Sequence, residues 1–483
     1  MKKLDELFKI IAKLAKKEKT PVYFVGGFVR DLLLGRTQKK DIDFVVEGSG
    51  LVFAKLLDQA LKEEGSLVEF SDFDTARYVI VQDEETINLE FAGARSEKYE
   101  SHSRKPVVEQ TSLDQDLSRR DFTVNAMALP VEYFDKLEKV TSIKKYIIDP
   151  FNGQKDLEDK ILKTPLDPDV TFSEDPLRMF RAIRFAAQLG FAIEPKTLEA
   201  IHRNRERIKI VSAERIQEEL IKLMSCNVPS IGLTLIFHTG LMDIILPEIS
   251  ALDGVEDVYG YRHKNNLVHT FKVVDTIAEH SDNVWLRMAG LFHDIGKPAT
   301  KKFLPRIGWT FHAHEHVGRK MIQSIGRRLR FPLDNIKYLA KLIRWHMQPI
   351  GLMDDGITDS AVRRLIVNLG KEINDLLILG RADITTGNPN KKERRLKNYD
   401  WLEDQIAEVI EKDKLRAFQS PVRGEEIMKE CGLKPGPTVG KIKKALEEAI
   451  LDGKIPNEYE AVKKYFEEIK EEYLNSVQEW EKV

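Results

Sequence analysis

The pattern of apolar residues changes near residue 150, and this change limits the folds that the chain can adopt. Before it, short β-prone runs such as VYFV, DIDFVV and RYVIV alternate with helical stretches, as in α/β and α+β domains. From Asp156 to the C-terminus, helical periodicity dominates. We therefore expect an α+β fold class, with one mixed domain followed by an all-helical remainder.

Length and composition indicate several globular domains. The chain has 483 residues, of which 42% are hydrophobic, so it can form several cores. Its net charge of −2 excludes a uniformly basic nucleic-acid coat but leaves a local basic groove open. The two cysteines, Cys226 and Cys431, cannot form a disulfide framework, which predicts a cytoplasmic location. We expect no signal peptide and no membrane span.

A Gly-Gly turn lies between a predicted strand and a predicted helix. The run VYFV precedes Gly26 and Gly27, and the helical run FVRDLLLG follows them. A turn of this kind directs backbone N–H groups and a helix N-terminus at one point, which suits a triphosphate. The glycine pair alone fits an ordinary tight turn equally well.

Two aspartates follow in the predicted strand DIDFVV. Asp41 and Asp43 are two residues apart and share one face of the strand, while Ile42 and Phe44 face a core. Converging carboxylates suit Mg²⁺, and two such ions can activate a hydroxyl and stabilise a leaving pyrophosphate. The alternative is an edge strand with solvated aspartates. The glycine turn upstream favours the metal site.

The segment GGFVRDLLLGRTQKKDIDFVV resembles the signature of class II tRNA nucleotidyltransferases (CCA-adding enzymes) and of bacterial poly(A) polymerases. These families belong to the nucleotidyltransferase superfamily related to DNA polymerase β. The resemblance implies that Asp41 and Asp43 bind catalytic Mg²⁺ and that Gly26 and Gly27 contact the triphosphate. It also implies a third catalytic carboxylate on a neighbouring strand, and Glu90 in INLEFAGAR is the best candidate.

Further motifs follow in the order of this family. SLDQDLSRRDFTVNAMA is similar to the segment that binds the ribose and the phosphates, and its arginines offer guanidinium forks for phosphate. A surface helix of mixed charge is the alternative. The segment DPFNGQKDL resembles the family's hinge, with Gly153 as the bend. The nucleotide-binding residues implied by the resemblance are Gly26, Gly27, Arg30, Arg119, Asp121, Asn125, Asp175, Arg178, Arg181 and Arg184.

The segment SEDPLRMFRAIRFAAQLGF predicts a helix with Ser173 as its N-cap and Pro176 in its first turn. Asp175 and Arg178 are three residues apart and would share a face. In the family, a Glu-Asp-x-x-Arg helix pairs with the Watson–Crick edge of CTP or ATP, which a carboxylate acceptor and an arginine donor can do. A simple surface ion pair is the alternative.

The segment ARSEKYESHSRKPVVEQTS lies where the family has a flexible loop that is tied to the switch from C to A addition. Its Ser101–Pro106 stretch departs from the Pro-Gly-Ala-Leu-Pro-like run of the family. Much further along the chain, at residues 212–223, SAERIQEELIKL matches a helix-stabilising motif of the family, for which we expect a structural role.

Histidines and aspartates that suit a metal gather in the helical remainder. His293 and Asp294 are adjacent in RMAGLFHDIGKP, and further histidines and aspartates follow on later helices. Imidazoles with carboxylates are good ligands for a transition metal with open positions. One histidine on an apolar helix face is more often a core residue, but the adjacent pair is more specific.

This region resembles HD-superfamily phosphohydrolase domains. The resemblance implies phosphatase or 2′,3′-cyclic phosphodiesterase activity on tRNA 3′ ends, with a divalent transition metal. It implies two ligand sets: His269, His293, Asp294 and Asp383 for one metal, and His314 and His346 for a second metal or the substrate phosphate. His280, His312 and His316 receive no role.

In the tail, Gly436 and Gly440 flank a predicted helix N-terminus that lysines follow, an arrangement that can hold a backbone phosphate. A solvated lysine face is the alternative. The expected domains are a nucleotidyltransferase head (1–148), a helical neck and body (149–254), an HD domain (255–395) and a helical tRNA-binding tail (396–483).

These features predict addition or repair of the 3′-terminal CCA of tRNA with CTP and ATP. The tRNA hydroxyl would attack the α-phosphate of the nucleotide. A CC-adding or A-adding specialist and a poly(A) polymerase are alternatives, because the same head serves all of them. A second alternative is a phosphohydrolase whose head only docks RNA; the pairs Asp41/Asp43 and Asp175/Arg178 argue against it. The oligomeric state stays open.

Overall fold

The computed structural model forms two compact units, Met1–Pro247 and Glu248–Val483. The four domains expected from the sequence, with limits at 148, 254 and 395, stay a prediction. The stretch Ser101–Pro106 lies outside the described residues. No helix among the described residues is long and apolar enough to cross a membrane. The structure describes residues 2–36, 41–62, 64–82, 85–98, 107–137, 143–255, 257–258, 261–262, 265–354, 358–413, 420–475 and 477–482.

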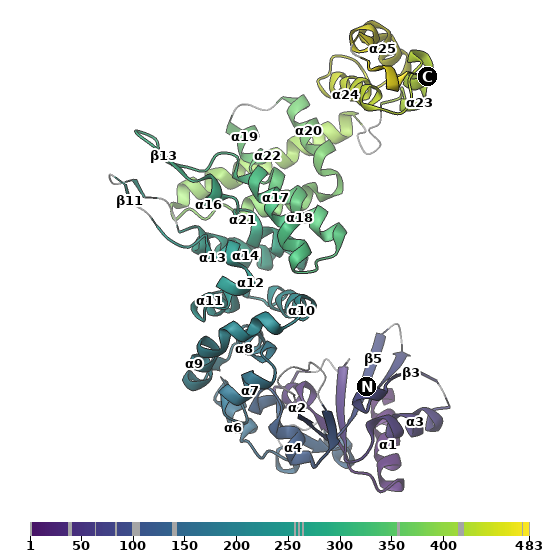
Figure 1. The fold of residues 1–483 in the computed structure, drawn as a ribbon, viewed down its shortest axis with the longest axis vertical. Helices are drawn as coiled ribbons and strands as arrows, with labels where there is room; N and C mark the ends of the chain where they lie inside the picture. The colour runs from purple at the N-terminus through teal and green to yellow at the C-terminus, as the bar shows by residue number, and fades with distance from the viewer. Residues whose placement is uncertain are drawn as a thin grey trace. The chain divides into compact units, whose positions relative to one another are not determined.

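A six-stranded sheet organises the head in the first unit (Figure 1). The strand order is β3-β4-β5-β2-β1-β8, with β2 and β5 parallel and all other neighbours antiparallel. A separate antiparallel hairpin pairs β6 with β7. The strands are β1 (Val22–Val25), β2 (Asp41–Val46), β3 (Ser66–Phe70), β4 (Thr75–Gln82), β5 (Glu85–Gly93), β6 (Arg95–Lys98), β7 (Val107–Gln110) and β8 (Ala128–Pro130).

Helices cover both faces of this sheet. α1 (Lys2–Lys17), α2 (Gly27–Leu33) and α3 (Gly50–Ala60) bury apolar side chains against one face, and α4 (Leu113–Ser118) packs on the other. Phe44 stacks on Phe91 with ring centroids 4.6 Å apart, because alternate residues of β2 and β5 face the α1–α3 core. The strand prediction for DIDFVV is thus confirmed: Asp41 and Asp43 are exposed between buried neighbours.

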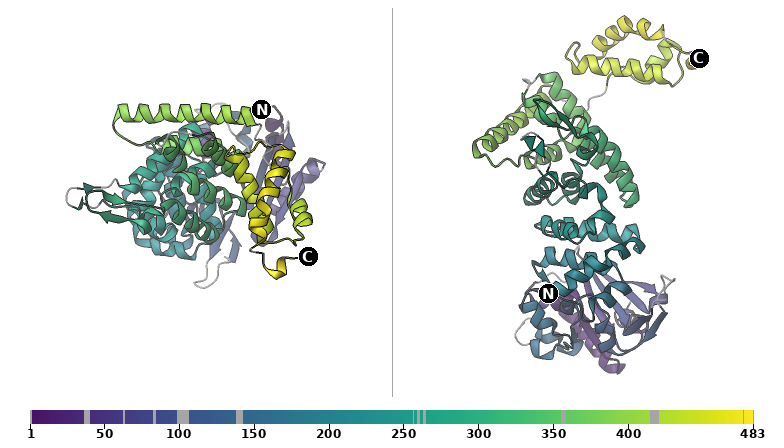
Figure 2. Two further views of the ribbon diagram at one scale, coloured as in Figure 1. Left: turned by 90° about the horizontal axis from the view of Figure 1, so that it is seen from above. Right: turned by 60° about the vertical axis from the view of Figure 1, so that its left-hand side comes forward.

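The rest of the first unit is helical apart from the two-residue strands β9 (Ile161–Leu162) and β10 (Ala192–Ile193). In the right-hand view of Figure 2 these helices, blue to teal, lie next to the head. The α-helices are α6 (Gly153–Glu158), α7 (Pro168–Glu174), α8 (Leu177–Leu189), α9 (Pro195–Asn204), α10 (Ala213–Met224), α11 (Pro229–His238) and α12 (Met242–Ile245). The 3₁₀ helices of the unit are η1 (Ser71–Phe73), η2 (Thr123–Asn125), η3 (Val131–Lys136), η4 (Lys144–Tyr146) and η5 (Arg205–Ile210).

Two local predictions in this region were wrong. Ser173 lies inside α7 and does not cap α8; the chain breaks at Asp175, which is extended because a proline follows it, and Pro176 occupies the N-cap position. The bend near Gly153 comes from Asn152, whose φ is 59°. Gly153 is required for another reason, since a Cβ there would lie 2.2 Å from the Thr123 carbonyl oxygen.

The second unit is mainly helical, as the sequence predicts. Two short hairpins, β11 with β12 and β13 with β14, interrupt it. Helices α23 to α25, yellow in Figure 1, share an apolar core of their own around Ile442 and Phe466. The α-helices are α13 (Pro247–Ser250), α14 (Asn266–His280), α15 (Val284–Phe292), α16 (Lys297–Thr300), α17 (His314–Arg328), α18 (Leu333–Trp345), α19 (Gln348–Asp354), α20 (Asp359–Leu369), α21 (Ile373–Ala382), α22 (Pro389–Asp413), α23 (Gly424–Cys431), α24 (Pro437–Leu451) and α25 (Tyr459–Leu474). The remaining elements are β11 (Asp257–Val258), β12 (Tyr261–Arg262), β13 (Lys302–Leu304), β14 (Gly308–Thr310), η6 (Gly370–Glu372) and η8 (Glu479–Glu481).

Candidate nucleotide site and metal centre

A cavity of about 890 Å³ opens in the first unit where the head meets α8 and α10. Strand β1 leads into it through the glycine turn, and β2 brings an aspartate to the same place. Of the residues that the sequence singles out, the cavity is lined by Gly26, Gly27, Arg30, Asp43, Arg120, Asp121, Asn125, Arg181 and Arg184. Residues 158 positions apart in the chain thus meet at one site, from Gly26 to Arg184.

Gly26 occupies the tightest position of this cavity. Its φ is 67°, a conformation that residues with a Cβ adopt at a cost. A Cβ on Gly26 would lie 3.2 Å from Nη1 of Arg120 and 3.3 Å from Oδ2 of Asp43. The glycine therefore brings a carboxylate, a guanidinium and the N-terminus of α2 to one point, which suits a polyphosphate and a cation.

The three candidate catalytic carboxylates lie on adjacent parallel strands. Asp43 is the register partner of Glu90, so both side chains share a face. Each outer carboxylate has another partner: Asn88 donates a hydrogen bond of 2.7 Å to Asp41, and Glu90 forms an ion pair of 3.0 Å with Arg77. Loss of hydration and the neighbouring carboxylates raise the pKa of Asp43, while Arg120 opposes this rise. A divalent cation would relieve the same repulsion.

Arg119 and Arg120 share one buried anchor that sequence reasoning missed. Asp116 is fully buried; its Oδ1 accepts from Arg119 and its Oδ2 from Arg120, at 2.7 and 3.0 Å. Although burial alone would raise the pKa of Asp116, the two arginines hold it below its ordinary value. Of the two arginines, Arg120 lines the cavity.

A chain of hydrogen bonds joins the head to α8. Arg30 donates to Asn125 (2.8 Å), Asn125 donates to Asp121 (2.9 Å), and Asp121 accepts from Arg181 (2.6 Å). Asn125 reaches Asp121 from η2, a 3₁₀ turn. Burial favours the neutral acid, but Arg181 and Asn125 lower the pKa of Asp121 to about 2. On α8, Arg184 is buried against Glu219 of α10.

Asp175 and Arg178 have other partners and do not face each other as a free pair. Asp175 caps α8 by accepting from the Leu177 N–H (3.1 Å) and forms an ion pair of 2.7 Å with Arg215. Arg178 donates to Glu174 at 3.0 Å. Arg215 lies in the motif SAERIQEELIKL, so the expected structural role of that motif includes holding this carboxylate.

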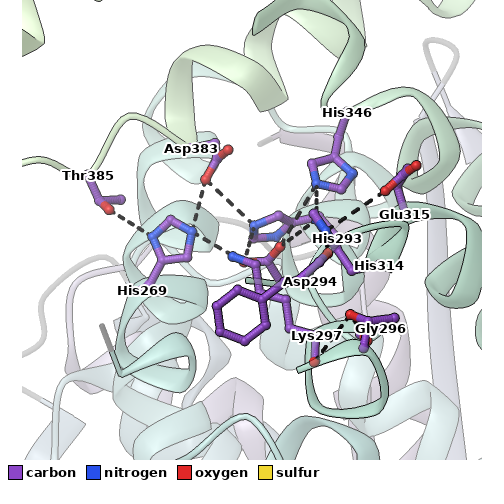
Figure 3. A network of polar contacts seen from close by, with 12 residues as sticks. His269, His293, Asp294, Gly296, Lys297, His314, Glu315, His346, Asp383 and Thr385 are labelled. Atoms are coloured by element: carbon purple, nitrogen blue, oxygen red, sulfur yellow. Dashed lines mark hydrogen bonds and ion pairs between the residues drawn. The ribbon is translucent and has the colours of Figure 1, made fainter. Parts of the chain in front are cut away.

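The candidate metal ligands of the second unit converge from the ends of several helices (Figure 3). His269 lies in α14 and His314 opens α17, whereas His293 and His346 directly follow α15 and α18. The structure gathers ligand atoms within 4.8 Å of one another in two groups, His269 with His293 and Asp383, and Asp294 with His314 and His346. Among the described residues the head carboxylates form no such group.

Asp294 lies between the two groups and contacts both. Its Oδ2 is 3.1 Å from Nε2 of His293, and its Oδ1 is 3.4 Å from Nε2 of His314. The sequence assigned Asp294 to the first set alone, whereas one oxygen faces each set. Lys297 also reaches Oδ2. Despite its burial, His293 and Lys297 hold the pKa of Asp294 well below the ordinary range.

The histidine tautomers favour a metal. Nδ1 of His314 and of His346 lies within 2.9 Å of a backbone carbonyl, which only accepts, so in the neutral rings Nδ1 carries the proton and Nε2 a lone pair. The Nε2 atoms of His314 and His346 face each other at 3.1 Å. Burial lowers the pKa of His346 to about 4, which keeps its ring neutral near pH 7. Nε2 of His293 lies 3.1 Å from Oδ2 of Asp294, and although burial opposes the change, this carboxylate raises the pKa of His293.

These observations fit divalent metal binding. The lone pairs of His314 and His346 that face each other are unfavourable unless a cation occupies the space between them. Imidazole nitrogens with carboxylates suit a transition metal. The hydroxyl of Thr385 lies 2.7 Å from Nδ1 of His269, and this hydrogen bond fixes the orientation of the ring.

The expected phosphate position in the tail is occupied by a side chain of the protein. The Thr438 N–H, at the N-terminus of α24, donates to Glu481 (2.9 Å), and Glu481 packs on Gly436. Lys443 and Lys444 lie near glutamates of the same helix. These contacts favour the alternative of a solvated lysine face.

A family model described as "Poly A polymerase head domain" matches residues 22–163, and one described as "HD domain" matches residues 266–385. Between them, "Probable RNA and SrmB- binding site of polymerase A" matches residues 190–252. The protein therefore belongs to the class in which a nucleotidyltransferase head is joined to an HD domain. Its architecture is α+β, as the sequence predicts.

Curated relatives specify the family. The A-adding tRNA nucleotidyltransferase of Deinococcus radiodurans is 31% identical over 72% of this chain and 78% of its own length. The CC-adding tRNA nucleotidyltransferase of Thermus thermophilus is 30% identical over 90% of this chain and 91% of its own length. The Multifunctional CCA protein of Pseudomonas fluorescens is 32% identical over 65% of this chain and 71% of its own length. The chain belongs to the tRNA nucleotidyltransferase family.

Solved structures show the same fold. A CCA-adding enzyme in apo form I matches with a TM-score of 0.60 at 22% identity, over 100% of this chain and 96% of that chain. The Thermotoga maritima CCA-adding enzyme complexed with tRNA matches with a TM-score of 0.57 at 20% identity, over 96% and 95%. At these identities the likeness concerns the fold alone.

Proposed function

We propose that the head adds or repairs the 3′-terminal CCA of tRNA, using CTP and ATP. The main observation in support is that Gly26, Asp43 and Arg120 line one cavity, which is large enough for a nucleotide. The names of the relatives, which include CC-adding, A-adding and multifunctional CCA proteins, support this substrate class. The cytoplasmic location stays a prediction.

The residues divide the work in the head as follows. Asp41 and Asp43, with Glu90, would hold Mg²⁺, which when bound lowers the pKa of the attacking hydroxyl and stabilises the charge of the pyrophosphate. The N–H groups of the glycine turn and Arg120 bind phosphate oxygens of the nucleotide. The chain of hydrogen bonds that runs from Arg30 to Arg181 fixes the remaining donors of the cavity in place, so little reorganisation accompanies nucleotide binding.

Base selection falls to Asp175 and Arg178 in this proposal. Because Asp175 is paired with Arg215, and Arg178 with Glu174, both must exchange partners before they can bond a base edge. The exchange replaces one charged hydrogen bond by another, so its net cost is small. Arg119, Arg181 and Arg184 contribute positive charge around the phosphates.

The second unit would hydrolyse phosphate esters with a divalent transition metal held by His269, His293, Asp294 and Asp383, and a second by Asp294, His314 and His346. In such hydrolysis the ester P–O bond breaks while a P–O bond forms to water, and the water proton passes to the leaving oxygen. Lys297 is placed beside Asp294 to contact a phosphate oxygen.

A specialist that adds only CC or only A is the second candidate. It is favoured by the relatives from Thermus thermophilus and Deinococcus radiodurans, which carry those names at the same level of identity. The lengths of products on tRNAs with different ends decide between the candidates.

The test of the head site is Asp43→Asn, with exposed Asp135→Asn as the matched control. We expect Asp43→Asn to lower CTP incorporation at least about 100-fold, since transition-state charge loses its stabilisation, while ester hydrolysis by the second unit persists. Asp135→Asn should leave both activities intact. An unchanged incorporation rate in Asp43→Asn would refute the assignment.

A further inference from the structure

A basic hairpin leads directly into the metal centre. We call residues 301–312 the arm; it contains β13 and β14, whose register pairs Phe303 with Trp309 (Figure 1). Two residues after the arm, His314 opens α17, and its Nδ1 donates to the Phe311 carbonyl at 2.9 Å. The arm is therefore fixed to a candidate metal ligand at one end.

One part of the arm is aromatic. The rings of Phe303 and Trp309 meet edge to face with centroids 5.3 Å apart, and the Lys301 ammonium lies 4.4 Å from the Trp309 ring. Phe311 continues toward the metal centre: the ammonium of Lys297 lies 5.7 Å from its ring and also bonds Asp294. Half-exposed rings and cations thus form one path from the arm to the metal centre.

The arm is also positively charged. Its sequence KKFLPRIGWTFH contains no acidic residue. Lys302 and Arg306 are exposed, and neither forms an ion pair with another described residue. Ile307 at the turn is 68% exposed. Exposed apolar side chains next to a group of positive charges are a feature of interaction surfaces.

We propose that the arm binds the last nucleotides of a single-stranded RNA 3′ end whose terminal phosphate ester enters the metal centre. Only a polyanion with planar bases uses both features, because phosphates pair with Lys302 and Arg306 while bases stack on Trp309. A small phosphate ester needs neither. The inference rests on the proposed hydrolase function of the second unit and adds the element that binds the RNA beside the metal centre.

The first test reverses charge on the arm and compares two substrates. The variant Lys302→Glu/Arg306→Glu is measured with a short 3′-phosphorylated single-stranded RNA and with p-nitrophenyl phosphate. We expect the KM for RNA to rise at least about 10-fold with kcat unchanged, and the slope of log KM against log salt to fall by about 1.4, that is 0.7 for each lost phosphate contact. Neither kcat nor KM for p-nitrophenyl phosphate should change.

Controls separate this effect from a general loss of charge. Lys337→Glu/Lys371→Glu removes two exposed lysines beside Trp285, at the other end of α15 from His293. It should leave the KM for RNA unchanged. Trp309→Ala should raise the KM for RNA at least about 5-fold, and Trp309→Phe should restore it, because stacking needs only an aromatic face.

The outcomes distinguish the two proposals. Absence of any ester hydrolysis by the metal-loaded parent protein contradicts the proposed hydrolase function, and the role of the arm falls with it. Hydrolysis of both substrates with an unchanged KM for RNA in the arm variants overturns the arm alone. Equal changes for RNA and p-nitrophenyl phosphate also overturn it, since they indicate a disturbed metal centre.

Discussion

Asp121 is the residue on which the junction between the head and α8 depends. It accepts from Asn125 on the head side and from Arg181 on the other, and it is nearly fully buried. Its pKa of about 2 lies below the ordinary 3.8, so the ionised carboxylate stabilises the fold at neutral pH. That contribution is complete above about pH 4 and is lost as the pH falls through about 2.

We therefore expect Asp121→Asn to lower the free energy of unfolding by about 2 kcal/mol near pH 7. The difference from the parent protein should shrink below pH 4, where the parent carboxylate also becomes protonated. Urea unfolding at a series of pH values, followed by circular dichroism, measures this, with exposed Asp135→Asn as the control. A difference that is independent of pH would mean that packing rather than charge stabilises the junction.

Side-chain pairing was the part of the site that the sequence predicted least well. Local patterns singled out Gly26, Asp43 and His293, which lie at the cavity or in the histidine cluster, because each belongs to a strand, a turn or an adjacent pair. Asp116 and Arg215 were not predicted as partners of site residues, since their contacts depend on how separate segments pack. No periodicity reports such contacts.

At the scale of elements, the turn between β1 and α2 makes a sharp prediction. Gly26 and Gly35 both have a positive φ, 67° and 69°, but a Cβ on Gly26 meets Arg120 and Asp43, whereas one on Gly35 meets nothing within 4 Å. Gly26→Ala and Gly35→Ala should each cost about 1 kcal/mol of stability from backbone strain. Only Gly26→Ala should also reduce CTP incorporation, at least about 10-fold.

The measurement pairs chemical denaturation with initial rates of CTP incorporation for both variants. Equal losses of activity in the two variants would show that the turn acts through stability alone. Retained activity in Gly26→Ala would show that the close approach to Asp43 is not needed.

Elements were predicted well where periodicity is strong and less well where helices meet. The strand of Asp41 and Asp43 follows directly from its alternating pattern. The junction at Asp175 was misplaced, because the run from Ser173 onward has helical periodicity on both sides of Pro176 and only the proline marks the break.

At the scale of the whole molecule, the two units should respond differently to metals. The head has oxygen ligands, which Mg²⁺ prefers, whereas the second unit offers histidines, which favour transition metals. After chelation and removal of the chelator, Mg²⁺ should restore CTP incorporation but not ester hydrolysis. Mn²⁺, Co²⁺ or Ni²⁺ should restore hydrolysis, and bound metal can be counted by mass spectrometry. Recovery of both activities with Mg²⁺ alone would contradict the assignment.

The product that the head makes distinguishes addition of the whole CCA from addition of CC or A alone. The most direct measurement is the length of products on three tRNAs, one without CCA, one ending in C and one ending in CC, each with Mg²⁺, CTP and ATP. We expect all three to be extended to CCA and no further. Growth that stops at CC, extension of only the CC-ended tRNA by one A, or long A-tails on unrelated RNA would each contradict this expectation.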